Sequence, residues 1–217
     1  MKSINPVNGL IRYSFYSASG NLSIAFIVIS VLGVTLLATG ASTTYLIFGS
    51  LTMLFTPMFL MTGTGGGATK KWEKMKVAMP VKRKDVITSH YYSIILATIV
   101  GLPFFGVILT ISFFLHEDLL DYVMSTAHIF LPFFLGAPLL TSALFYPLAY
   151  TIGENKEEAL TIVCMLAVSG ILGLFIWIGG TANLAPGALI LLIIAASVIP
   201  FIVSYAITKS VYAKKDF

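Results

Sequence analysis

The sequence predicts an all-α, polytopic membrane protein with six transmembrane helices, because its charges are clustered, its uncharged tracts are long and its composition is apolar. All 13 basic and nine acidic side chains fall in five short patches, at residues 2–12, 70–85, 117–121, 154–158 and 209–216. Hydrophobic residues make up 58% of the chain and charged residues 10%, a balance that excludes a soluble domain. Since a helix needs about 20 apolar residues to cross a bilayer, the two shorter tracts fit one crossing each and the two longer tracts fit two.

The first expected element is an amphipathic helix in the leader, residues 1–21. At helical spacing, Leu10, Ile11 and Phe15 share one face, and Arg12 lies on the flank of that face. Such a helix would lie in the plane of the cytoplasmic membrane interface before the chain turns into the bilayer. A frayed, partly ordered tail is the alternative.

A single transmembrane domain, residues 22–217, is expected to follow the leader. Small and hydroxyl residues at 39–44 interrupt the first long tract as a turn, which places helices near residues 22–38 and 45–61. The two shorter tracts predict helices near residues 86–115 and 127–152, each long enough to tilt or kink.

The last long tract divides at residues 179–183 and Pro186, which places the final helices near residues 160–178 and 187–208. Several prolines fall inside the expected helices, where each removes a backbone donor and favours a kink. They are Pro103, Pro132, Pro138, Pro147 and Pro200. Local bending alone and a hinge role in transport both remain open interpretations.

The positive-inside rule places both termini of a six-helix chain in the cytoplasm. In that orientation every Lys and Arg lies on the cytoplasmic side, and the only external charges are Glu117, Asp118 and Asp121. The net charge of +4 therefore reflects membrane topology and contact with membrane lipids, and it does not indicate binding of nucleic acid.

None of the six expected helices contains Asp, Glu, Lys or Arg. Carriers driven by ion gradients usually keep an ionisable group at membrane depth, so the sequence disfavours that class. No hydrolase motif is present, and His90, His116 and His128 are too scattered for a metal site, so we interpret them as solvated or interfacial. The glycine-rich run before Lys70 lacks the spacing of a phosphate loop. No catalytic, metal-binding or ATP-binding residue is therefore predicted.

The most informative polar segment is the loop at residues 63–85, between the second and third expected helices. Trp72, Met75 and Met79 recur at i, i+3 and i+7, which predicts a short helix with one apolar stripe that ends at Pro80. Such a helix either lies on anionic lipid or inserts its apolar stripe into a groove of a cytoplasmic partner.

The same loop resembles the first inner loop of ABC-2 type transporter permeases. The resemblance rests on residues 71–74, 79–80, 83–87 and 89–91, which are similar to the pattern W-E-[KR], M-P-[VI]-x-R-K-[DE]-[IV] and S-K-Y. Position 90 departs from this pattern, with His in place of Lys. The pattern is most similar to the small six-helix branch of the family, which includes the staphylococcal exporter of phenol-soluble modulin peptides.

The resemblance implies a non-catalytic permease subunit of an ATP-driven exporter in the bacterial plasma membrane. Its cytoplasmic partner would be an ABC ATPase that carries ATP and Mg²⁺, and a second permease chain, identical or different, would complete the pathway. No cofactor is implied on this chain. The loop would be the coupling helix that docks on the ATPase. The residues implied in docking are Trp72, Glu73, Lys74, Met75, Met79, Pro80, Lys82, Arg83, Lys84 and Asp85.

The loop near residues 154–158 faces the same side of the membrane and offers a second candidate contact with the ATPase. Its charged residues are Glu154, Lys156, Glu157 and Glu158. The alternative is a solvated turn whose acids favour the start of the next helix.

Two functions of different class remain open. One is the exporter permease, and the other is a non-transporting membrane scaffold, such as an immunity or sensor protein whose inner loop binds a regulator. An ABC-2 permease gene should lie beside a gene for a cytoplasmic ATPase, whereas a lone gene would favour the scaffold. Because the helices offer no fixed charge, an exporter of this composition suits hydrophobic or amphipathic peptides or antimicrobial compounds.

Overall fold

The computed structural model describes residues 6–16, 82–115, 119–152 and 157–213. This part of the chain is helical apart from residue 82 and a turn at residues 182–185, and it contains no strand, which confirms the all-α class. Four of its helices are long and apolar enough to cross a membrane, over Lys84–Pro103, Pro132–Ile152, Ala159–Thr181 and Pro186–Ala213. The helices expected near residues 22–38 and 45–61 lie outside the described residues, so six crossings remain a prediction.

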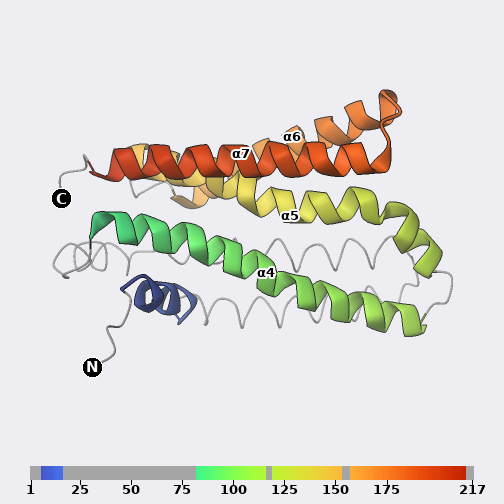
Figure 1. The fold of residues 1–217 in the computed structure, drawn as a ribbon, viewed down its shortest axis with the longest axis horizontal. Coiled ribbons are helices and arrows are strands. Elements are labelled where there is room, and N and C mark those ends of the chain that lie inside the picture. Colours follow the sequence, from blue (N-terminus) through green and yellow to red (C-terminus); the bar gives the residue numbers. More distant parts are fainter. Residues whose placement is uncertain (1–5, 17–81, 116–118, 153–156, 214–217) are drawn as a thin grey trace.

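The four long helices are α4 (Arg83–Leu115), α5 (Leu119–Ile152), α6 (Glu157–Thr181) and α7 (Pro186–Ala213) (Figure 1). All four extend beyond the expected ranges. In particular, α4 begins at Arg83 instead of residue 86, and α5 begins at Leu119 instead of residue 127. Asp85 and Asp121, expected in loops, therefore lie in the first turns of helices. An acid there is stabilised by the helix macrodipole, so a charge patch need not mark a loop.

The four helices alternate in direction along one bundle. The start of α4 and the end of α7 lie together at one end (Figure 1). A core cluster at this end joins one or more side chains from every long helix, among them Val86, Ala149, Cys164 and Tyr212. We call this end the basic end, because Lys82 and Lys84 lie at the start of α4 and Lys209 lies just before the last turn of α7.

The leader forms a helix at residues 6–16 that packs against the basic end. Leu10 is buried in the core cluster of that end and Phe15 packs against it, whereas Arg12, Tyr13 and Tyr16 are exposed. Figure 1 shows this helix nearly end-on, while α4, α5 and α7 run across the view. The leader helix therefore lies across the bundle, in the direction expected of a helix in the membrane interface.

The turn between α6 and α7 is closed by capping at both helix ends. Asn183 has a φ of 48°, a left-handed conformation that Asn tolerates well. The N–H of Leu184 donates to the carbonyl of Gly179 at 3.0 Å, and the N–H of Asn183 donates to that of Gly180 at 3.3 Å. These two bonds satisfy carbonyl groups at the end of α6. Pro186 then begins α7. The N–H of the first residue of a helix has no acceptor within the helix, so proline costs no hydrogen bond at this position.

This turn gives a direct test of orientation. In a chain with Cys164→Ala, a Leu184→Cys probe should react with a membrane-impermeant thiol reagent in intact cells, because Leu184 is exposed at the turn. A Lys209→Cys probe, exposed near the other end of α7, should react only after the cells are permeabilised. Labelling of Lys209→Cys in intact cells would reverse the predicted orientation.

Candidate functional site

Most of the predicted docking loop, including residues 70–80 and their apolar stripe, lies outside the described residues. Its last residues lead straight into α4, since the N–H of Asp85 donates to the carbonyl of Lys82 at 2.8 Å and the helix begins at Arg83. Lys82 and Lys84 are exposed, and Asp85 is half-buried. A displacement of residue 82 would therefore act on α4 without an intervening flexible linker.

The second candidate contact is described only in part. Glu154 and Lys156 lie outside the described residues, whereas Glu157 and Glu158 are the first two residues of α6. Acids at that position stabilise a helix start, so the placement of these two is accounted for without a partner protein. Their role in docking remains a prediction.

A chain of hydrogen-bonded hydroxyl groups joins α4, α7 and α5 near the basic end. The Tyr91 hydroxyl lies 2.7 Å from Ser204 Oγ and 2.9 Å from Thr208 Oγ1, and Ser204 Oγ donates to the carbonyl of Ala143 at 2.7 Å. Because Ser204 has one hydroxyl hydrogen, Tyr91 must donate to Ser204, and Thr208 must then donate to Tyr91. The hydrogen bonds therefore run in one direction, from Thr208 through Tyr91 and Ser204 to Ala143.

Pro147 explains why this chain ends at Ala143. In a helix the N–H of residue 147 would bond to the carbonyl of residue 143, but proline has no N–H. The carbonyl of Ala143 thus lacks its usual partner within α5, in a span where no water is at hand. Ser204 of α7 supplies the missing donor. A proline in one helix and a serine in another therefore form one interhelical contact.

Aromatic rings surround the hydroxyl chain. The Tyr91 ring lies 5.0 to 5.3 Å, between centroids, from Phe201, Tyr205 and Tyr146. His90 is only 3% exposed and its ring lies 5.7 Å from that of Tyr146. Of the two interpretations of His90, solvated or interfacial, the burial contradicts the first, because α4 turns this residue toward Tyr146 of α5.

The hydroxyl chain predicts a specific loss of stability. Replacing Ser204 with Ala should lower the free energy of unfolding by about 1 to 2 kcal/mol, because the Ala143 carbonyl would lose its donor inside the membrane. Ser210→Ala is the matched control, since Ser210 lies on the same helix and is exposed; it should change the stability by less than about 0.5 kcal/mol. Chemical unfolding of the purified chain in mild detergent measures both variants, and equal stabilities would contradict the role given to Ser204.

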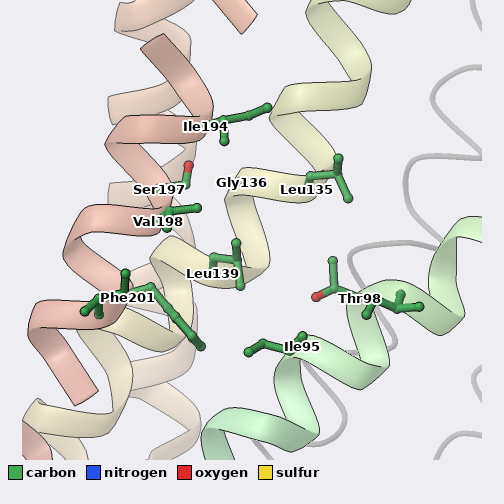
Figure 2. A pocket seen from close by; sticks show the side chains of 11 residues that line it. Ile95, Thr98, Leu135, Gly136, Leu139, Ile194, Ser197, Val198 and Phe201 are labelled. Atoms are coloured by element: carbon green, nitrogen blue, oxygen red, sulfur yellow. The ribbon is translucent and has the colours of Figure 1, made fainter. Parts of the chain in front are cut away.

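A cavity of about 460 Å³ lies between α4, α5 and α7, within their membrane spans. Figure 2 shows Ile95 and Thr98 of α4 on one side of it, with Val198 and Phe201 of α7 on the other. None of its lining side chains is ionisable. The lining residues are Ile95, Thr98, Ile99, Leu135, Gly136, Leu139, Ile194, Ser197, Val198, Phe201 and Ile202.

The two hydroxyl groups in the cavity wall are already engaged as donors. Thr98 donates to the carbonyl of Ile94 at 2.9 Å and Ser197 to that of Ile193 at 2.7 Å, both within their own helices. Gly136 lets α5 approach α7 closely, because a Cβ at that position would collide with the Ser197 hydroxyl. The cavity therefore offers an apolar surface whose two hydroxyl groups have no spare hydrogen to donate.

Neither the hydroxyl chain nor the cavity was predicted from the sequence, although the sequence of α7 contains a pattern that indicates the hydroxyl chain. Ser197, Ser204 and Thr208 recur at i, i+7 and i+11 in α7, which is a polar stripe on an otherwise apolar helix. All five prolines singled out from the sequence lie inside α4, α5 and α7. Their bending and hinge roles remain predictions.

Comparison with known proteins gives one match. A family model described as "ABC-2 family transporter protein" matches residues 9–213, a range that takes in most of the leader helix, the predicted docking loop and all four described spans. No curated protein and no solved structure matches the chain.

Proposed function

The chain belongs to the ABC-2 family of transporter proteins, and from this membership we propose that it is the membrane-spanning permease subunit of an ATP-driven exporter in the bacterial plasma membrane. A separate cytoplasmic ABC ATPase would bind ATP and Mg²⁺, so this chain would need no cofactor and no catalytic residue. The observation that carries the proposal is the family match over residues 9–213.

The geometry of α4 supports a mechanical role for the predicted docking loop. We propose that the stripe of Trp72, Met75 and Met79 docks on the ATPase and that nucleotide-driven movement displaces the start of α4. Since α4 begins directly after the loop, and Tyr91 bonds to Ser204 and Thr208 on α7, the displacement would reach α7 within the first three turns. The loop near residues 154–158 would form a smaller second contact.

The cavity supports a hydrophobic or amphipathic cargo, such as a membrane-active peptide or an antimicrobial compound. An apolar cavity without ionisable side chains gives no counter-charge for an ionic solute, whereas it accepts alkyl and aromatic groups that enter from the bilayer. A second permease chain would complete the pathway. The many exposed apolar side chains of α6 and α7, such as Leu166, Trp177 and Ile202, are compatible with contact to lipid or to that second chain.

The scaffold alternative makes a different prediction for the neighbouring gene. An exporter permease should be encoded beside a cytoplasmic ATPase that has a phosphate loop, and the two products should purify as one complex when they are expressed together. The complex should hydrolyse ATP. If the neighbouring genes encode no ATPase and the purified chain neither binds nor stimulates one, the scaffold is the better account.

A further inference from the structure

The basic end of the bundle carries two lysines on facing helices. Thr88 of α4 and Tyr205 of α7 touch, with 2.9 Å between their hydroxyl oxygens, and both are half-buried, so the contact lies near the bundle surface. Lys84 precedes Thr88 by one helical turn, and Lys209 follows Tyr205 by one turn. Both lysines are exposed. They therefore flank the same contact on the side nearer the expected cytoplasmic surface.

The apolar cavity lies on the other side of that contact. On α4, Ile95 and Ile99 continue the face that carries Lys84, at spacings of 11 and 15 residues. On α7, Ile202 and Val198 continue the face that carries Lys209, at spacings of seven and 11 residues. The contact surface between α4 and α7 thus carries two positive charges at the basic end and, beyond the Thr88–Tyr205 contact, an uncharged cavity deeper in the membrane.

The distance from the two lysines to the cavity matches the thickness of one leaflet of a bilayer. At about 1.5 Å per residue, Ile95 lies about 16 Å from Lys84 along α4, and Val198 lies about 16 Å from Lys209 along α7. The hydrocarbon core of a bilayer is about 30 Å thick, so the chains of one leaflet span about 15 Å. A lipid whose phosphate lies at the lysines would place the end of an acyl chain in the cavity.

We propose that an anionic phospholipid of the leaflet at the basic end binds along α4 and α7, with its phosphate at Lys84 and Lys209 and one acyl chain that passes over the half-buried Thr88–Tyr205 contact into the cavity. Basic residues between membrane helices attract anionic headgroups. The cavity accepts a hydrocarbon chain because the Thr98 and Ser197 hydroxyls donate within their own helices. An uncharged cargo would use the cavity but would gain nothing from the lysine pair. The lipid would hold α4 and α7 together beside the Tyr91 hydrogen bonds, whether or not the chain transports anything.

Native mass spectrometry of the purified full chain tests the proposal with two probes that share their acyl chains. Dioleoylphosphatidylglycerol should bind more tightly than dioleoylphosphatidylcholine. In the double variant Lys84→Gln, Lys209→Gln, the affinity for phosphatidylglycerol should fall about 25-fold, because each lysine near a headgroup contributes about fivefold. The affinity for phosphatidylcholine should fall by a clearly smaller factor, because its choline cation offsets the phosphate charge that the lysines attract.

A second pair of variants tests the cavity. Val198→Trp places a large ring in the cavity and should lower the affinity for both phospholipids, whereas Val203→Trp, on the same helix but outside the lining, should leave both affinities unchanged. If Val198→Trp fails to fold, the double lysine variant decides alone, because both of its changes are on exposed residues. Equal binding of the two lipids, or undiminished phosphatidylglycerol binding in the lysine variant, overturns the proposal. Competition with 1-hexadecanol gives a further test. If 1-hexadecanol displaces phosphatidylglycerol equally well from the original chain and from the double lysine variant, the site recognises an uncharged apolar ligand and the proposal is overturned.

Discussion

Replacing Trp72 and Met75 together with Ala is expected to release the partner ATPase from this chain. The apolar stripe predicted at residues 72–79 would fill a groove on the ATPase, and truncating a large aromatic anchor of this kind typically costs about 2 kcal/mol or more. That cost is about 30-fold in affinity. The measurement is co-purification of the two subunits in detergent, followed by the ATPase activity that elutes with the permease.

Membrane insertion of the double variant should remain normal, because neither residue lies in an expected crossing. The control is Trp177→Ala, which removes the other tryptophan of the chain from an exposed position on α6. This control should keep the ATPase bound, since residue 177 lies toward the end of α6 away from the basic end. Undiminished ATPase in the double variant would show that docking does not use this stripe.

The placement of charges in the sequence predicted much of the described fold, but the predicted helices were shorter than the observed ones. The turn between α6 and α7 lies beside the glycines, Asn183 and Pro186 that mark a break in the sequence. The carbonyls of Gly179 and Gly180 accept the capping bonds, and Pro186 begins α7. The starts of α4 and α5 were placed too late. The reason is that an acid such as Asp85 is favourable in the first turn of a helix, where it looks the same in the sequence as an acid in a loop.

The sequence could not predict which helices would meet across the bundle. A hydroxyl stripe on α7 and a proline in α5 were visible separately, but the bond from Ser204 to the Ala143 carbonyl depends on the relative rotation and height of the two helices. The cavity has the same origin, because its walls come from three helices that are far apart in the chain. The burial of His90 also follows from helix rotation, which the local sequence did not fix. The docking residues at 70–80 stay predictions.

Energy coupling is the central claim, and it follows from two features of the chain. None of the expected crossings holds an Asp, Glu, Lys or Arg that could carry a proton or a sodium ion. At the same time, the predicted docking loop leads directly into α4, whose hydrogen bonds with α7 would pass on a displacement. Hydrolysis of ATP by the partner would therefore supply the free energy of export, and a proton gradient would not.

The most direct measurement follows a fluorescent amphipathic peptide into inside-out membrane vesicles that contain this chain and its partner ATPase. Replacing the catalytic carboxylate of the ATPase should reduce ATP-dependent uptake to the background of vesicles that lack the permease. Collapsing the proton gradient while ATP is held constant should leave uptake nearly unchanged. Uptake that persists without ATP hydrolysis and disappears with an uncoupler would contradict the account.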